Sequence, residues 1–355
     1  MVEERFPTSG LSAEYGDIIM NSVTKTVSLE VSYQGKIILS EIYVPDSDAK
    51  IYIKDLGMLA MNFKSKADFS IYNGIDGACV QLTVSLTEGS QVVSKDVTIY
   101  QCIVDFADSL NIDLLKTIPL SRMTKKKTGV GRTEFTSFYG GSTVKAYIVK
   151  KGHNQDIAIT VNIIALANPN NMYRINVSPE IVAALADCYP SDLVYYEIYT
   201  NKDQVIRFVM EQRSYPQLRT FVFRNCFGAQ ESFTCTGDEE SSRKWSREYG
   251  LSKNINIQLT RDLVNSITVN TGLVTNRSVE ALEDLLNSDQ LALLDAQGFQ
   301  AIIILEENFK NNSRRDEVRS FDFTYRFAGY NQFRTTYAPF KTPRVFDDTF
   351  NETFN

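Results

Sequence analysis

The sequence contains few of the side chains that enzymes use most often for acid–base and metal chemistry. It has one histidine, His153, and five cysteines, no two of which form a C-x-x-C pair. Because a structural zinc site takes four closely spaced ligands, these residues do not predict one. We expect no metal ion and no cofactor. We expect buried free thiols at the cysteines, which are Cys79, Cys102, Cys188, Cys226 and Cys235.

Long hydrophobic runs are also missing. The longest, such as Ala301–Leu305, have the length of a strand, whereas a membrane helix takes about 20 apolar residues. Residues Met1–Pro7 carry two glutamates where a secretion signal would carry positive charge and then an apolar run. We therefore expect a chain that is made in the cytoplasm, is not secreted through a signal peptide and does not insert into a membrane.

An excess of positive charge is absent as well. The 37 basic residues are outnumbered by 43 acidic ones, which leaves a net charge of -6 at pH 7. A protein whose surface binds nucleic acid is normally basic, so we expect no nucleic-acid partner. The chain is nevertheless 43% hydrophobic, with 18 tyrosines and 21 phenylalanines. That is enough apolar material for a packed core, and it excludes wholesale disorder.

Alternation of apolar and polar residues is the dominant pattern. Residues 27–33 alternate in this way, Gln34-Gly35 supplies a turn, and Lys36–Tyr43 returns. Similar segments recur at intervals of roughly 10 to 15 residues with turn signals between them, as in β-sandwiches and barrels. The clearest is residues 319–327, where Phe and Tyr alternate with polar side chains. The sequence therefore predicts an all-β fold.

At about 150 residues per domain, 355 residues predict two domains. Asn168–Asn171 is the clearest break, and Ser178 followed by Pro179 marks the start of a short helix. Ser278 is expected to cap a second helix over residues 279–286. We predict two β-sandwich-like domains with short accessory helices: an N-terminal arm at 1–20, a first sandwich at 21–168, a linker at 169–190, a second sandwich at 191–328 and an extended aromatic arm at 329–355.

The C-terminal segment loses alternation but keeps its aromatic residues. Phe346, Phe350 and Phe354 recur every four residues among acidic and polar ones, and Phe340 precedes them. Burying each phenylalanine is worth roughly 2 kcal/mol. The arm is therefore expected either to pack on its own domain or to dock on a neighbouring subunit. Deleting residues 344–355 distinguishes the two.

Lys125, Lys126 and Lys127 form the most basic run in the chain, and Gly129-Val130-Gly131 follows them. A phosphate-binding loop would lie at a strand-to-helix turn, and this segment does not. We expect an exposed connection between strands. It is either solvated or in contact with an acidic neighbouring subunit.

The remaining polar groups do not form a catalytic pattern. His153 falls in a polar loop between two predicted strands, where a solvated side chain is more common than a general base. The residues Gly237–Ser242 have the composition of a calcium loop but not its spacing. Glu239-Glu240 and Glu306-Glu307 are sequence neighbours, and glycoside hydrolysis requires two carboxyl groups on either side of a sugar. We therefore expect that the protein is not an enzyme.

Three stretches and the C-terminal pattern carry a resemblance to a known group of proteins. They are Ile51–Gly57, Val97–Cys102, Phe221–Gly228 and the Phe-Asp-x-Thr-Phe-Asn pattern at Phe346–Asn351. The whole chain resembles uncharacterised structural proteins of tailed phages and prophages of Bacteroides-type bacteria. The resemblance implies a tail-tip or baseplate component similar to a distal tail protein, and it brings no active-site residues.

Two functions follow as expectations. The first is a non-enzymatic virion protein of the phage tail, which forms a homo-oligomeric ring and docks other tail proteins. The alternative is a carbohydrate-binding module that adheres to host surface glycans through surface aromatic residues.

Overall fold

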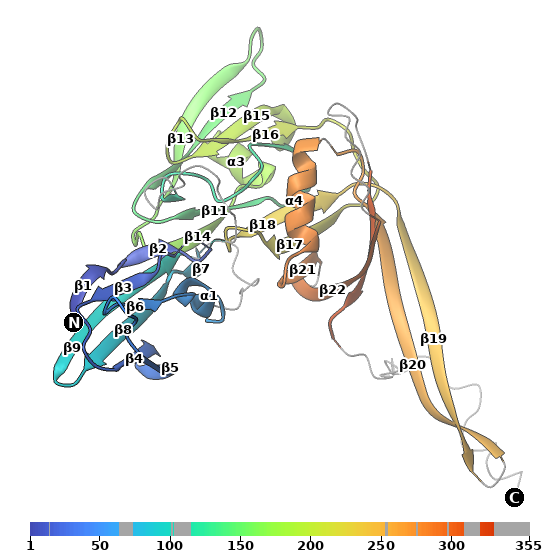
Figure 1. Cartoon of the computed structure of the whole chain (residues 1–355). Helices are drawn as coiled ribbons and strands as arrows, with labels where there is room; N and C mark the ends of the chain where they lie inside the picture. Colours follow the sequence, from blue (N-terminus) through green and yellow to red (C-terminus); the bar gives the residue numbers. More distant parts are fainter. Residues whose placement is uncertain are drawn as a thin grey trace, which may run out of the picture.

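The computed structural model describes residues 1–13, 15–63, 74–100, 102, 115–252, 255–274, 276–296, 298–308 and 320–329. Over these ranges the chain is built mainly from β-strands, and its helices are short (Figure 1). The prediction of an all-β, sandwich-like fold with short accessory helices is confirmed. Most of the predicted C-terminal arm lies outside the described residues.

The N-terminal part forms two sheets around one core, with α1 (Leu56–Met61) at their side. Alternation explains the core, because Val27, Leu29 and Val31 are fully buried while the residues between them are not. The larger sheet has the order β2 (Ser9–Leu11), β9 (Gln91–Tyr100), β8 (Val80–Glu88), β4 (Val27–Tyr33) and β5 (Lys36–Tyr43). The smaller has the order β1 (Val2–Arg5), β3 (Ile18–Asn21) and β6 (Ile51–Ile53).

The expectation of an N-terminal arm over residues 1–20 is wrong. β1 pairs antiparallel with β3, and β2 pairs parallel with β9. Ile18 and Met20 are fully buried, so this segment completes the core rather than leaving it.

A five-stranded sheet forms the second part, packed against α3 (Pro179–Leu185). Its strands come from both sides of the predicted linker at 169–190, so that range does not separate two sandwiches. Val144, Ile198 and Phe208 share one core, and burying them together requires the strands on either side of α3 to pair. The sheet order is β10 (Lys125–Thr128), β16 (Ile206–Met210), β15 (Leu193–Tyr199), β12 (Thr143–Lys150) and β13 (Ile157–Ala165), and the 3-10 turn η1 (Pro190–Asp192) precedes β15.

The third part is a seven-stranded sheet covered by α4 (Asn276–Leu286), as Figure 1 shows. Val279, Leu282 and Leu285 of α4 pack on Phe221 and Phe323 of the sheet. The helix begins at Asn276, so Ser278 lies in its first turn and does not cap it. The sheet order is β18 (Gln230–Cys235), β17 (Arg219–Arg224), β21 (Leu291–Asp295), β22 (Gly298–Asn308), β23 (Asp322–Phe327), β20 (Ile255–Asn270) and β19 (Glu239–Ser252).

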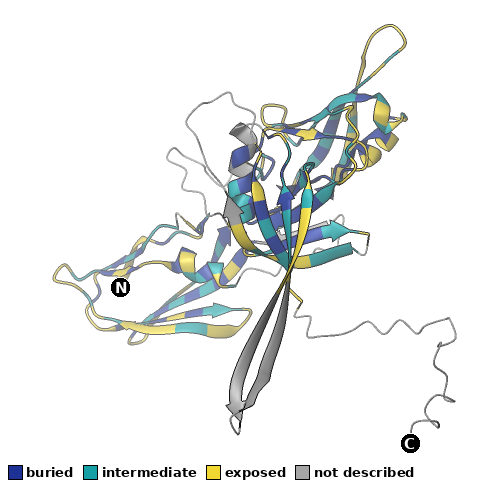
Figure 2. Cartoon of the chain, turned by 90° about the vertical axis from the view of Figure 1, so that its right-hand side faces the viewer, coloured by how far each residue is buried: buried dark blue, intermediate teal, exposed yellow. Residues whose placement is uncertain are grey.

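A small central sheet joins these parts. Its order is β11 (Phe135–Tyr139), β14 (Asn171–Asn176) and β7 (Gly74–Ala78), so it includes one strand from the N-terminal segment. The predicted break at Asn168–Asn171 lies immediately before β14. Figure 2 shows that buried residues lie along the sheets and that exposed residues gather at hairpin ends and outer edges.

Candidate functional site

A long two-stranded hairpin projects from the seven-stranded sheet (Figure 1). β19 and β20 pair from Glu239↔Val269 to Ser252↔Ile255. Of the sixteen residues of β20, the last four, Ile267–Asn270, also pair with β23, and the twelve before them have β19 as their strand partner. At about 3.3 Å per residue, this unsupported part is about 40 Å long.

The hairpin corrects two sequence interpretations. The predicted loop at Gly237–Ser242 contains the start of β19. Alternation also predicts two separate strands at 254–259 and 266–271, and residues 255–259 and 266–270 of these belong to the single strand β20. A ribbon that leaves the body of a protein has no core-facing side, so alternation does not mark it. The mixed charge of residues 239–248 is the signal that remained in the sequence.

The root of the hairpin is held by side-chain contacts on both strands. The Arg219 guanidinium donates to both carboxylate oxygens of Glu239, with an Nη2···Oε1 distance of 3.1 Å. The Thr268 and Thr324 hydroxyls are 2.8 Å apart, and the Asn270 amide donates to Asp322 Oδ1 over 2.7 Å. The direction in which the hairpin leaves the sheet is therefore set by several bonds.

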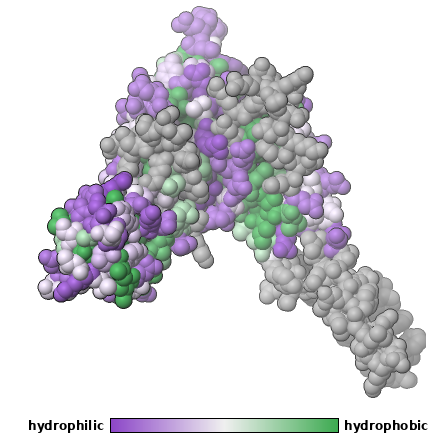
Figure 3. All heavy atoms as spheres, in the orientation of Figure 1, coloured by the Kyte–Doolittle hydropathy of each residue, from purple (hydrophilic) through white to green (hydrophobic). Residues whose placement is uncertain are grey.

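An apolar patch lies over β22 in the same part of the chain (Figure 3). Ile303 and Leu305 are 44% and 40% exposed, and Ala301 on the same side of the strand is exposed as well. Ile302, which points the other way, is buried against the α4 core. The outer face of this sheet therefore presents aliphatic side chains to solvent.

The three lysines at 125–127 form strand β10, which pairs parallel with β16. Lys125 and Lys127 are exposed as expected, but all three lysines belong to a strand and not to a connection, and Lys126 is only 4% exposed. In a strand successive side chains point to opposite faces, so the middle lysine points inward. Its Nζ atom lies 2.5 Å from Glu231 Oε1 on β18.

Glu231 is the centre of a buried polar group that also includes Ser121 and Asn225. The Ser121 hydroxyl donates to Glu231 Oε1 over 2.6 Å, and the Asn225 amide donates to Oε2 over 2.9 Å. Glu231 is 2% exposed, so these donors and Lys126 compensate for its lost hydration. A charged residue inside the otherwise uncharged run Gln230–Cys235 was the available sequence signal, and the sequence reasoning did not use it.

Glu134 is a second buried carboxylate beside this group. Its Oε2 atom accepts a bond from the Ser232 hydroxyl over 3.2 Å. Burial raises the pKa of Glu134 above its ordinary value, and the Lys126 ammonium acts in the opposite direction. The Ser178 hydroxyl, at the N-cap of α3, accepts the Glu134 backbone N–H over 3.0 Å. The predicted helix start is confirmed, but its serine bonds to the backbone of the residue immediately before β11.

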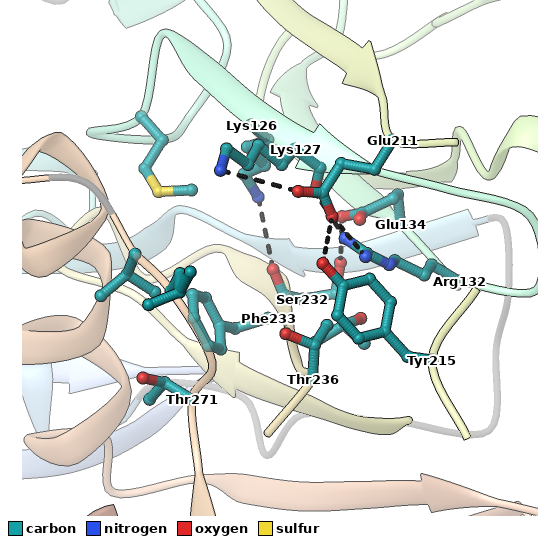
Figure 4. Close-up of a pocket in the computed structure, with 14 residues that line it drawn as sticks. Lys126, Lys127, Arg132, Glu134, Glu211, Tyr215, Ser232, Phe233, Thr236 and Thr271 are labelled. Atoms are coloured by element: carbon teal, nitrogen blue, oxygen red, sulfur yellow. Dashed lines mark hydrogen bonds and ion pairs between the residues drawn. The ribbon is translucent and has the colours of Figure 1, made fainter. Parts of the chain in front are cut away.

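Arg132 and Glu211 line the outer side of the same region, which Figure 4 shows. Arg132 Nη2 donates to Glu211 Oε2 over 2.6 Å, and the Tyr215 hydroxyl donates to the same oxygen over 3.4 Å. The cavity that these residues enclose with Lys126 has a volume of about 60 Å³. Ligand sites are typically 300–1,000 Å³, so this cavity is small for a substrate site.

The ion pairs therefore join layers of the fold. β10 contributes Lys126, and Glu134 lies immediately before β11. β18 contributes Glu231 and Ser232. Arg174 of β14 adds a further link, because it donates to Gln230 Oε1 and its guanidinium lies 5.0 Å from the Phe135 ring centroid. This buried polar junction connects the seven-stranded sheet to the five-stranded sheet through Lys126 and to the central sheet through Arg174.

Asn225 organises the turn that follows β17. Its Oδ1 atom accepts the backbone N–H groups of Phe227 and Ala229, each over 3.1 Å. Its Nδ2 atom donates to the Leu120 carbonyl over 2.7 Å. Gly228 has a positive φ of 72°, which favours glycine. The stretch Phe221–Gly228, which carries part of the resemblance, thus contains the end of β17 and a turn that depends on Asn225 and Gly228.

The other sequence candidates are dispersed. Phe340, Phe346, Phe350 and Phe354 lie outside the described residues. His153 is exposed in the loop between β12 and β13. All five cysteines are free, as predicted; three are buried, and Cys188 and Cys226 are half-buried.

Within the described ranges, no group of three or more His, Cys, Asp or Glu side chains could hold a metal ion. No helix among the same residues has the length and apolar character needed to cross a membrane.

No protein-family model and no curated protein sequence matches the chain. Among solved structures, one match is SGBP-B of the mixed-linkage glucan utilization locus of Bacteroides ovatus, in complex with a mixed-linkage heptasaccharide. The match covers 84% of this chain and 67% of that chain, at 10% sequence identity and a TM-score of 0.16. A similarity at this level carries no argument about fold or function.

Proposed function

We propose that this protein is a non-enzymatic structural subunit of a phage tail tip or baseplate, located in the virion tail. It forms a homo-oligomeric ring and docks other tail proteins. The observation that carries the proposal is the β19–β20 hairpin. A two-stranded hairpin is marginally stable in water unless something packs against it. A ribbon about 40 Å long that leaves its own sheet therefore favours an assembly in which a neighbour covers it.

The exposed aliphatic face of β22 supports the same proposal. Ile303 and Leu305 are exposed on the same sheet that carries the hairpin. Contiguous exposed apolar surface beside a projecting element is typical of protein contacts. The resemblance at Ile51–Gly57, Val97–Cys102 and Phe221–Gly228 supplies the tail as the kind of assembly.

Shortening the hairpin tests the proposal. Ser242 and Ser266 are direct cross-strand partners, so a two-residue Asn-Gly turn can replace residues 243–265 without changing the root. We expect the wild type to form a defined ring by native mass measurement and negative-stain imaging, and the shortened variant to be folded but to form no ring. Replacing Gly152–Gln155, at the end of the β12–β13 hairpin, by the same turn is the control that leaves the ring intact.

A wild type that forms no ring, or a ring that the shortened hairpin leaves unchanged, contradicts the proposal. Removal of residues 344–355 then tests separately whether the aromatic arm contributes to subunit contacts.

A specific observation also favours the carbohydrate-binding alternative. Tyr147 and Tyr195 lie side by side on the outer face of the five-stranded sheet, with ring centroids 6.4 Å apart. The Arg207 guanidinium lies 4.8 Å from the Tyr195 ring centroid. Half-exposed aromatic rings beside a guanidinium group are suited to bind the flat face of a sugar. Binding on a glycan array that is lost in Y147A/Y195A would establish this function, and an array without signal would remove it.

A further inference from the structure

β13 forms an outer edge of the five-stranded sheet, and on that side no other described strand pairs with it. Its nine residues, Ile157–Ala165, read Ile-Ala-Ile-Thr-Val-Asn-Ile-Ile-Ala. The strand contains no charged residue, no proline and no glycine. It thus presents a row of backbone donors and acceptors flanked by apolar side chains.

The other long edges of the described sheets differ from β13 in this respect. β5 carries Lys36 and Glu41, and β19 carries acidic and basic residues along its length. Charges on an edge strand oppose pairing with another chain, and an uncharged, exposed edge lacks that protection. The absence of charge on β13 is therefore what a strand that accepts a partner requires.

The two faces of β13 also fit a partner strand. Ile159, Val161 and Ile163 point to the core side and are only partly buried against it. Ala158 and Asn162 point to the outer face and are exposed. A strand added at this edge would cover the open flank of the three aliphatic side chains and leave the polar side in water.

We propose that β13 is a docking edge for β13 of a second copy of this chain, paired antiparallel about a two-fold axis at Thr160. A two-fold axis makes the contact self-complementary, so a strand without charge meets no like charge. The regular stretch ends where the register with β12 shifts, after Asn162, and an axis at Thr160 uses that stretch best. Ile159 then faces Val161 of the second copy, and Ala158 faces Asn162 of the second copy.

This pairing is independent of the proposed ring. A ring is built by head-to-tail contacts between different surfaces, whereas this contact joins identical surfaces and produces pairs. The two together would give two rings placed face to face. If the ring does not form, a dimer is still expected.

Charge placement at two exposed positions tests the contact. In A158E/N162E each new glutamate is opposite a glutamate of the second copy, and we expect the native mass to fall by half. In the control A158K/N162E, opposite charges meet and the wild-type mass is retained. In β12 the direct partners of these positions are Val149 and Lys145, so neither variant places like charges within one chain. Circular dichroism checks that both variants are folded.

A crosslinking experiment tests the register. Opposite residues in an antiparallel pair have Cα atoms about 4.5–5.5 Å apart, within disulfide range. Thr160→Cys is therefore expected to form a disulfide-linked dimer on mild oxidation. In the same register the two copies of Ile164→Cys are about 26 Å apart along the strands and remain unlinked. A monomeric wild type, a mass unaffected by A158E/N162E, or equal crosslinking at both positions would overturn the proposal.

Discussion

The Nζ atom of Lys126 on β10 lies 2.5 Å from the Oε1 atom of Glu231 on β18, and each side chain exposes 3% of its surface. The two strands belong to different sheets, so this ion pair links two layers of the fold. Because both charges are buried, each depends on the other for its stabilisation.

Removing one partner of this pair is expected to be strongly destabilising. Lys126→Met leaves Glu231 as an uncompensated buried charge, which typically costs about 3–5 kcal/mol. The double variant K126M/E231L removes both charges and is expected to recover much of that loss. Urea denaturation of the wild type, both single variants and the double variant measures the coupling. A Lys126→Met variant as stable as the wild type would contradict the assignment.

Glu134 is expected to make the stability of the protein depend on pH. Burial raises the pKa of its carboxyl above the ordinary value of 4.5, so the native state keeps this proton to a higher pH than the unfolded state. The contribution of Glu134 to stability therefore decreases as pH rises from the ordinary value through the raised native value. Glu134→Gln removes this dependence, so its stability relative to the wild type is expected to increase with pH over that interval.

Denaturant titrations at several pH values between 4 and 8 measure this difference. Glu180→Gln is a matched control, since Glu180 is an exposed carboxylate of the same neighbourhood. A difference between Glu134→Gln and the wild type that does not change with pH would show that the native pKa is not raised.

Asn225→Asp is expected to destabilise the turn after β17. The substitution keeps the oxygen that accepts the Phe227 and Ala229 N–H groups, but it removes the donor to Leu120 and places a carboxylate 2.9 Å from Glu231. A lost buried hydrogen bond costs about 1–3 kcal/mol, and the new charge repulsion adds to it. Thermal unfolding at pH 7 and pH 5 checks this, with the smaller loss at the lower pH. An equal loss at both pH values argues against the repulsion.

Gly140→Ala is expected to disturb the junction between β11 and β12. A Cβ atom at Gly140 would lie 2.0 Å from the Asn168 carbonyl oxygen, so the backbone has to move. Overpacking of this kind costs about 1–3 kcal/mol. Gly329→Ala is the control, because a Cβ atom there meets nothing within 4 Å. A melting temperature of Gly140→Ala equal to that of the control would be inconsistent with this packing.

Sequence reasoning identified strands that have one buried face. Residues 27–33 and 321–327 alternate because every second side chain enters a core, and the Gln34-Gly35 turn determines the first hairpin. It failed where pairing joins distant segments. β10 pairs with β16, about 80 residues later, and no local pattern indicates this.

The site residues were harder to predict for the same reason. Lys126 was placed on the surface because it stands in a run of three lysines, yet strand geometry turns it toward Glu231, 105 residues away in the sequence. The long hairpin was divided into a loop and two strands because neither of its sides faces a core. The contacts of the four phenylalanines of the C-terminal arm, with their own domain or with a neighbouring subunit, stay a prediction.

The geometry of the β19–β20 hairpin has a mechanical consequence. It is fastened at one end, where Ile267–Asn270 meet β23, and behaves as a cantilever about 40 Å long. A tilt of about 10° at the fastening displaces the far end by about 7 Å, whereas the fastening itself hardly moves. In the proposed assembly, a subunit that binds near the fastening would meet a fixed surface, whereas one that binds near the far end would be within reach over a range of positions.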